Sequence, residues 1–264
     1  MTEFSVISDL HLDFGSGPHV RFPESDVLLI AGDVIESKIL QEKYTDARAR
    51  GERKAFHRFC EAAVKDRQAV YAISGNHEPY GSDITESHDI MREAYTKHGI
   101  IYLDNETVIE QDYEIWGGTL WTSFDGGNGV FMERAENYMN DYARITHKDE
   151  MLKPYDVLQI HNDYLVELER FLDTPSDLPK IVMSHHGPSY KSVDPKFIND
   201  YLTNPSYVND YDHLVEKADL WVHGHTHSSH WYTIGKCRVM CNPYGYHGYE
   251  TKTGKINIGM TWSN

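Results

Sequence analysis

The chain has 264 residues and a formal net charge of −16 at pH 7, with 41 acidic side chains against 25 basic ones. This acidity repels nucleic-acid backbones and anionic membranes, so an extended nucleic-acid-binding surface is not expected. The hydrophobic content is 40%, but the longest apolar runs, such as "VLLIA" at 27–31, are too short to span a bilayer. Together these properties predict a globular protein with a sizeable core and no membrane segment.

The first residues and the cysteines predict a cytoplasmic setting. The chain begins "MTEFSVISDLH", which is typical of a strand and has no basic segment followed by an apolar one. Three cysteines make an odd number, and their spacing does not resemble a disulfide framework.

Short β-rich runs alternate along the chain with longer segments of helical periodicity. Strands are predicted at 4–8, 27–33, 69–75, 100–103, 115–121, 180–185 and 219–224. Helices are predicted between them at 40–66, 85–98, 132–145 and 156–172. A hairpin is expected around Gly235–Lys236. The alternation indicates an α/β fold, in which ligands gather where buried strands end and loops begin.

No repeat or linker divides the sequence, so one domain is expected over residues 1–264. Two loop-rich insertions stand out, at 123–131 ("SFDGGNGVF") and at 187–211, which is rich in Pro, Tyr and Asn. Loops above strand ends often form binding sites, so both insertions are expected to shape a pocket.

Side chains that can bind metals follow five of the predicted strands. They are Asp9 with His11, Asp33, Asn76 with His77, His185 with His186, and His225 with His227. Each has an ordinary alternative; Asp33, for example, could simply cap a helix, and Asn76 could be a turn residue. In an extended backbone, Asp9 and His11 would face the same side and reach one ion.

The joint occurrence of these residues at strand ends predicts two ligand sets. The first set is Asp9, His11, Asp33 and His227, and the second is Asp33, Asn76, His185 and His225. Asp33 can serve both because a carboxylate has two oxygens with free lone pairs. A shared carboxylate implies two ions about 3.5–4 Å apart.

In order, the segments "DLH" (9–11), "GD" (32–33), "GNHE" (75–78), "SHH" (184–186) and "GHTH" (224–227) carry a specific resemblance. Their combination resembles the calcineurin-like metallophosphoesterase superfamily. The resemblance implies a four-layer α/β/β/α sandwich with a dimetal site at one edge, and hydrolysis of a phosphoester. It also implies that His77 contacts the phosphate and assists the leaving group. His185 is the expected ligand of "SHH", with His186 as a rival, and His223 is expected to orient a neighbour.

The expected cofactors are two divalent or transition-metal ions, Mn, Fe, Zn or Co, because the donors are oxygens and imidazoles. A water bridging the two ions would lose a proton and attack phosphorus in line. The expected substrate is a small phosphoester such as a nucleotide. Tyr246 and His247, in "CNPYGYHGYE" at 241–250, could contribute to substrate binding, or this segment could be a packed loop.

Several substrate classes remain open. "GHTH" is similar to phosphodiesterase-type and small bacterial or phage-type members, which favours a phosphodiesterase or a small-molecule phosphatase. The Ser/Thr protein phosphatases carry Gly-Asp-x-x-Asp-Arg-Gly, whereas this chain has "GDVIESK" at 32–38, without that Asp and Arg. A third alternative is a non-catalytic metal-binding scaffold, but the chain retains every expected ligand and His77.

Overall fold

Two β-sheets form the centre of the molecule. The computed structural model describes residues 1–14, 22–250 and 256–264. In spatial order, the first sheet consists of β13 (Thr261–Ser263), β1 (Glu3–Ile7), β2 (Val27–Ala31), β3 (Ala69–Ile73) and β4 (Ile101–Tyr102). The second consists of β11 (His230–Ile234), β12 (Cys237–Cys241), β10 (Leu220–His223), β9 (Lys180–Met183), β6 (Glu114–Gly117) and β5 (Glu106–Ile109).

Parallel pairing brings the carboxyl ends of neighbouring strands to one edge of each sheet. β1, β2, β3 and β4 pair in parallel, and so do β6, β9, β10 and β12. Every residue of β2 and of β9 is buried, as a strand covered on both faces requires. The loops after β1, β2 and β3 therefore leave one edge of the first sheet, and those after β9 and β10 leave one edge of the second.

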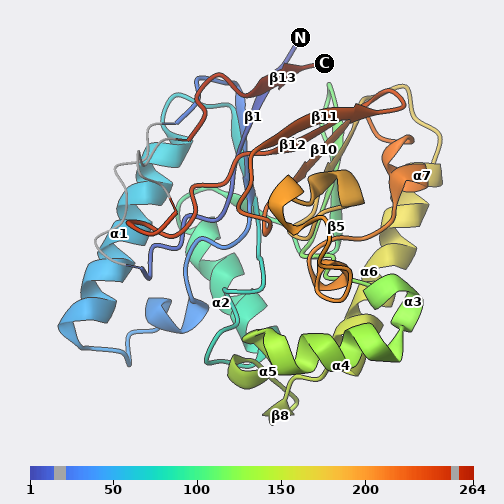
Figure 1. Ribbon diagram of the computed structural model, residues 1–264. Helices are drawn as coiled ribbons and strands as arrows, with labels where there is room; N and C mark the ends of the chain where they lie inside the picture. The colour runs from blue at the N-terminus through green and yellow to red at the C-terminus, as the bar shows by residue number, and fades with distance from the viewer. Residues whose placement is uncertain (15–21, 251–255) are drawn as a thin grey trace.

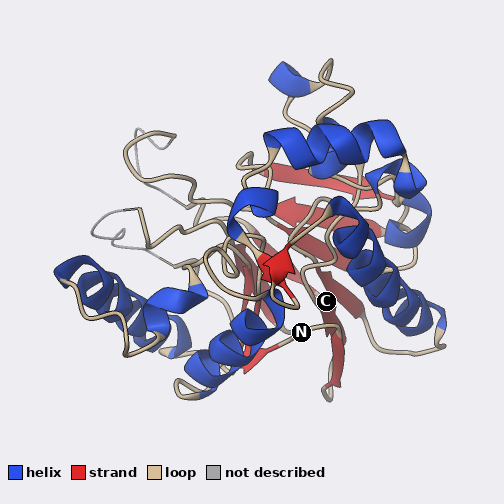
Figure 2. Cartoon of the chain, turned by 90° about the horizontal axis from the view of Figure 1, so that it is seen from below, coloured by secondary structure: helices blue, strands red, loops and turns tan. Residues whose placement is uncertain are grey.

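Apolar clusters arrange these sheets and the long helices in four layers. The long helices are α1 (Ala47–Val64), α2 (Ile84–Thr96) and α6 (Pro154–Asp173). Leu29 of the first sheet and Ile181 of the second belong to one buried cluster between the sheets. The outer face of the first sheet packs on α1 and α2, and that of the second packs on α6. Figures 1 and 2 show the helices on both outer sides of the strands. The predicted α/β/β/α sandwich is confirmed.

The helix predicted at 132–145 is interrupted in the structure. It consists of α4 (Gly129–Tyr138) and α5 (Asp141–Arg144), because Met139 has an extended backbone with φ −85° and ψ 137°. The remaining short elements are α3 (Phe124–Gly127), α7 (Asp212–Val215), β7 (Thr146–His147) and β8 (Glu150–Met151). The interruption matters because residues 138–140 line the cavity described below.

Other boundaries differ for local reasons. The helix predicted at 40–66 begins only at Ala47, where the Asp46 side chain caps it by accepting a hydrogen bond from Ala49 N. The hairpin around Gly235–Lys236 is confirmed by the antiparallel pairing of β11 and β12. Strands β5 and β13 were not predicted, because an edge strand that is mostly solvent-accessible has little hydrophobic alternation.

The two predicted insertions adopt compact local structure. Segment 187–211 contains 3-10 turns at Tyr190–Ser192, Pro195–Phe197 and Asn204–Ser206. Segment 123–131 contains α3 and the start of α4. Across the described ranges, no helix is both long enough and apolar enough to cross a membrane.

Candidate dinuclear metal centre

Most of the predicted ligands lie in loops just beyond the ends of buried strands. Asp9 and His11 follow β1, Asp33 follows β2, and His225 and His227 follow β10. All five have a positive φ, between 43° and 67°. The expectation that Asp9 and His11 share one side of an extended strand is therefore wrong. Left-handed backbone costs roughly 1–3 kcal/mol per residue and clusters at functional sites, which makes these loops a candidate site.

Hydrogen bonds hold these loops together. Asp9 N donates to Gly32 O at 3.0 Å, and His11 N donates to Asp33 O at 3.0 Å. The loop after β10 joins them through His225, whose backbone N–H donates to Asp9 Oδ1 at 2.9 Å. These bonds, and not the pleat of a strand, bring the carboxylates and imidazoles to one place.

Two groups of potential metal ligands share Asp33. The first group comprises Asp9, His11, Asp33 and His227, and the second comprises Asp33, His185 and His225. Within each group the ligand atoms lie within 4.8 Å of one another. Asp33 Oδ2 lies 3.8 Å from His11 Nε2 and 3.3 Å from His185 Nε2, so a single oxygen faces both groups. Asn76 Oδ1 joins the second group, at 3.2 Å from His185 Nε2.

Contacts to the other ring nitrogen orient two of these histidines. His185 Nδ1 lies 2.8 Å from Ala31 O, and because a carbonyl only accepts, Nδ1 carries the hydrogen and Nε2 turns toward Asp33. His227 Nδ1 lies 2.5 Å from Glu250 Oε2, and its Nε2 lies 3.4 Å from Asp9 Oδ1. Carbonyl and carboxylate contacts of this kind are typical of metal-binding histidines.

Positive charge on two histidines balances the buried carboxylates. Burial lowers the pKa of His185, but Asp33 outweighs this effect and raises the pKa to about 9. Burial likewise lowers the pKa of His227, and Asp9 raises it to about 10. Burial alone would raise the pKa of Asp33, whereas His185 and His77 hold it well below its usual range. The buried carboxylates thus remain ionised and need cationic partners, a role that metal ions can fill.

The donors of both groups fit divalent metal ions. They are carboxylate and amide oxygens and imidazole nitrogens, which suit Mn, Fe, Zn or Co. His225 Nε2 and His11 Nδ1 are buried without a hydrogen-bond partner, although buried polar atoms are nearly always paired. An ion held by the second group would give His225 Nε2 a partner.

His77 faces the space beside the two groups. Its Nε2 lies 4.0 Å from Asp33 Oδ2 and 3.2 Å from the Tyr246 hydroxyl. Its backbone N–H donates to Asp33 Oδ1 at 2.9 Å, which ties "GNHE" to the end of β2. The ring of Tyr246 lies 4.3 Å from that of His11, so this tyrosine of the C-terminal loop borders the first group.

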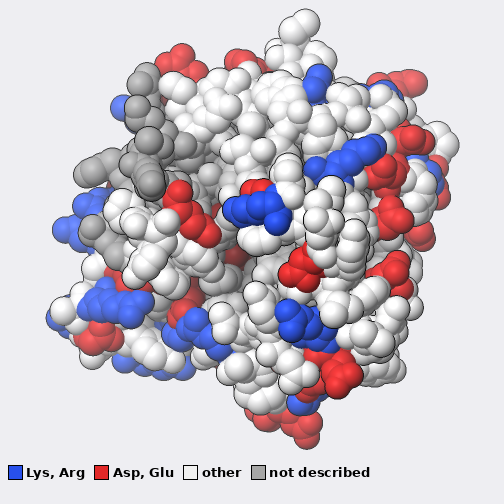
Figure 3. Space-filling view, viewed as in Figure 1, with Lys and Arg blue, Asp and Glu red and all other residues white. Residues whose placement is uncertain are grey.

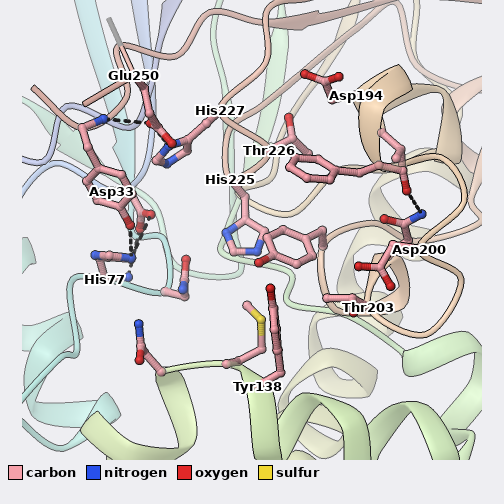
Figure 4. Close-up of a pocket in the computed structure, with 18 of the residues that line it drawn as sticks. Asp33, His77, Tyr138, Asp194, Asp200, Thr203, His225, Thr226, His227 and Glu250 are labelled. Atoms are coloured by element: carbon pink, nitrogen blue, oxygen red, sulfur yellow. Dashed lines mark hydrogen bonds and ion pairs between the residues drawn. The ribbon is translucent and has the colours of Figure 1, made fainter. Parts of the chain in front are cut away.

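A cavity of about 430 Å³ opens over both groups. Asp33, His77 and His227 line it from the metal-centre side, and Tyr246 and Glu250 from the C-terminal loop. The opposite wall comes from segment 187–211 and includes Asp194, Asp200 and Thr203, while Tyr207 of the same segment stacks on His225, with the ring centres 4.8 Å apart. Figure 4 shows His77, His225 and His227 on one side, with Asp194 and Asp200 across from them. Among the described lining residues, none belongs to segment 123–131.

Three other histidines highlighted by the sequence belong to neither donor group. His186 is buried and packs against the second group, with its ring 4.2 Å from that of His225 and 5.3 Å from that of Trp121. His247 is exposed and lies outside the described cavity lining. His223 is buried, and its Nε2 lies 2.7 Å from Ser192 Oγ, so it ties segment 187–211 to the end of β10.

Two buried acids near the centre were not predicted. Glu78 accepts hydrogen bonds from the backbone of Asp33, Val34 and Gly75, at 3.2, 2.7 and 2.7 Å, and so joins the loops after β2 and β3. Its place inside "GNHE" was a usable signal. Asp141, at the start of α5, contacts Asn76 at 2.8 Å and has no local sequence signal, because it is 65 residues away in the chain.

Gly75 allows Asp33 and His185 to approach each other. A Cβ at this position would lie 2.2 Å from Asp33 Oδ1 and 2.6 Å from two ring atoms of His185. We expect Gly75→Ala to displace these ligands and to weaken Mn²⁺ binding at least ~10-fold in a calorimetric titration. Gly51→Ala is the control, since a Cβ there meets nothing within 4 Å. It should leave binding unchanged and stabilise α1 by roughly 0.5–1 kcal/mol. Unaltered Mn²⁺ affinity in Gly75→Ala would contradict this reading.

Comparison with known proteins agrees with the fold. The model of the calcineurin-like phosphoesterase family matches residues 4–229. The chain therefore belongs to the calcineurin-like phosphoesterase family.

Among individual relatives, the chain is 23% identical over 194 residues to Uncharacterized protein L509 of Acanthamoeba polyphaga mimivirus, covering 67% of this chain and 68% of that protein. It is also similar in fold to the phosphopantetheinyl hydrolase of Mycobacterium tuberculosis, with a TM-score of 0.61 and 15% identity. That similarity covers 92% of this chain and 89% of the hydrolase.

Proposed function

We propose that this protein is a metal-dependent phosphoesterase, acting as a phosphodiesterase or a small-molecule phosphatase. The observation that carries the proposal is a pair of donor groups that share Asp33 beneath a cavity of about 430 Å³. The proposed ligands of one ion are Asp9, His11, Asp33 and His227, and those of the other are Asp33, Asn76, His185 and His225. When bound, two such ions lower the pKa of water and neutralise charge on a phosphoryl group.

The remaining site residues act on the substrate. His77 Nε2 lies at the edge of the cavity, within reach of a phosphoryl or leaving-group oxygen, and we assign it the stabilisation of that oxygen. The Tyr246 hydroxyl, 3.2 Å from His77 Nε2, is placed to contact the same group. The backbone N–H of His77 donates to Asp33 Oδ1, so the side chain that meets substrate is positioned by the shared ligand.

The cavity favours a small substrate. Its volume lies within the range of roughly 300–1,000 Å³ typical of small-molecule sites. Phe197 gives the wall opposite the metal groups exposed aromatic surface on which a nucleobase can stack, whereas the ring of Tyr207 already stacks on that of His225. Figure 3 shows Lys and Arg on one face as separate groups beside Asp and Glu, which argues against an extended nucleic-acid surface there.

The cavity lining supports a strict dependence of the proposed activity on metal. Among the lining residues that the structure describes, none is Lys or Arg, whereas Asp33, Asp194, Asp200 and Glu250 are acidic. The positive charge that attracts a phosphate must therefore come from the ions and the histidines. This also separates the site from one built around an arginine, as in the Ser/Thr protein phosphatases.

The test is hydrolysis of bis(p-nitrophenyl) phosphate beside p-nitrophenyl phosphate, with Mn²⁺ supplied and metal content measured on the same sample. We expect turnover of at least one ester with about two ions per chain, and its loss after chelation with recovery on adding Mn²⁺. Preference for the diester identifies a phosphodiesterase, and preference for the monoester a phosphatase. Two bound ions with no turnover of any phosphoester would favour a non-catalytic scaffold.

The cysteines support a cytoplasmic setting, which we also propose. Cys60, Cys237 and Cys241 are all buried free thiols. Thiols that stay unpaired are typical of proteins kept in a reducing compartment.

A further inference from the structure

Asp141 is a buried carboxylate that belongs to neither donor group. It is 3% exposed and begins α5. Burying a carboxylate is costly unless hydrogen bonds compensate for lost water. Asp141 Oδ1 accepts hydrogen bonds from Asn76 Nδ2 at 2.8 Å and from the Tyr80 hydroxyl at 2.7 Å. Asp141 is therefore hydrogen-bonded directly to Asn76, a proposed metal ligand.

The orientation of the Asn76 amide decides whether that side chain can bind an ion. An amide oxygen has lone pairs to offer, whereas the amide NH₂ offers only hydrogens. Asp141 Oδ1 is the acceptor in both of its hydrogen bonds, so it contacts the NH₂ end of Asn76. That contact turns Asn76 Oδ1 the other way, where it lies 3.2 Å from His185 Nε2.

Tyr80 completes this arrangement. Its hydroxyl donates to Asp141 and also lies 3.3 Å from Asn76 Nδ2. Its ring lies 4.3 Å from that of His77, and the Arg144 guanidinium lies over the ring at 4.4 Å. A side chain packed on two sides in this way holds its hydroxyl, and hence the carboxylate, in a fixed place.

We propose that Asp141 is a positioning residue that fixes Asn76 Oδ1 toward the second ion and thereby controls occupancy of that site. The inference rests on the proposed function for the presence of two ions. The first group is oriented by other contacts, notably that of Glu250 with His227. Loss of Asp141 should therefore weaken the binding of one ion and leave the binding of the other unchanged.

The test uses Mn²⁺ with the full chain, measured by calorimetry and by electron paramagnetic resonance. Asp141→Leu keeps a similar size but removes the acceptor. We expect this variant to bind one of the two ions ~10- to 100-fold more weakly and to lose the spectrum of coupled Mn²⁺ ions. Its affinity for the other ion should stay within about threefold of the wild-type affinity. Asp141→Asn can still offer an amide oxygen to Asn76, so it should retain the coupled spectrum with a smaller loss of affinity. Glu114→Gln is the control, since Glu114 is also buried, at 5% exposed. It lies at the start of β6, beside the first residue of β9, whereas His185 follows the other end of β9.

Several results would overturn the inference. They are wild-type binding of both ions by Asp141→Leu, an equal loss of both ions, or a wild-type protein that binds fewer than two. If circular dichroism shows that Asp141→Leu does not fold, Tyr80→Phe decides, because it removes the hydroxyl that donates to Asp141 Oδ1. It should weaken the binding of one ion and spare the other, and unchanged binding of both ions would contradict the inference. Failure of the proposed function is distinguishable, since wild-type protein with two ions and no turnover would disprove hydrolysis while the metal measurements still test Asp141.

Discussion

Asp33→Asn is expected to remove both metal ions and the activity together. Asp33 Oδ2 faces His11 and His185, one from each donor group, so a single substitution withdraws negative charge from both. Leaving buried cationic partners uncompensated costs about 3–5 kcal/mol, which corresponds to roughly a 10²- to 10⁴-fold loss of affinity. The metal content of the purified variant and its phosphoester turnover should therefore fall in parallel.

Asp13→Asn is the matched control for this experiment. Asp13 is also buried, at 2% exposed, and follows β1 in the same loop, but it is in neither donor group. It should retain both ions and most of the turnover. Asp33→Asn protein that keeps two ions with wild-type affinity would show that the carboxylate does not bridge them.

His77→Ala is expected to keep both ions but to lose rate. The His77 side chain is outside both donor groups, and its backbone N–H to Asp33 survives the substitution. Loss of a group that stabilises the leaving oxygen typically lowers turnover about 10²- to 10⁴-fold. Because p-nitrophenolate leaves easily, the loss should be smaller for a p-nitrophenyl ester than for an alkyl ester, and comparing kcat for the two esters checks this.

His213→Ala provides the comparison for His77→Ala, since His213 is exposed and lies outside the described cavity lining. It should match the wild type with both esters. Full activity of His77→Ala with both esters would refute the role assigned to His77, and loss of metal would move His77 into the ligand set.

The sequence by itself was sufficient for the fold class and for the position of most strands. Buried parallel strands are continuous apolar runs, so β2 and β9 are visible without any structure. Edge strands such as β5 escaped prediction, because solvent-accessible positions carry no such pattern. Residue chemistry at the strand ends also pointed to the candidate ligands, since few roles other than metal binding require so many carboxylates and imidazoles at one edge.

Only the tertiary structure decided how those ligands are held. The left-handed backbone at Asp9 and His11 depends on hydrogen bonds to the neighbouring loop, which the local sequence does not encode. His185 and His186 are adjacent residues of the same type, so the sequence does not distinguish them, yet of the two only His185 contacts Asp33. Asp141 reaches Asn76 from a different helix. Sequence patterns report local periodicity and residue chemistry, whereas side-chain direction and contacts across 65 or more residues are set by packing.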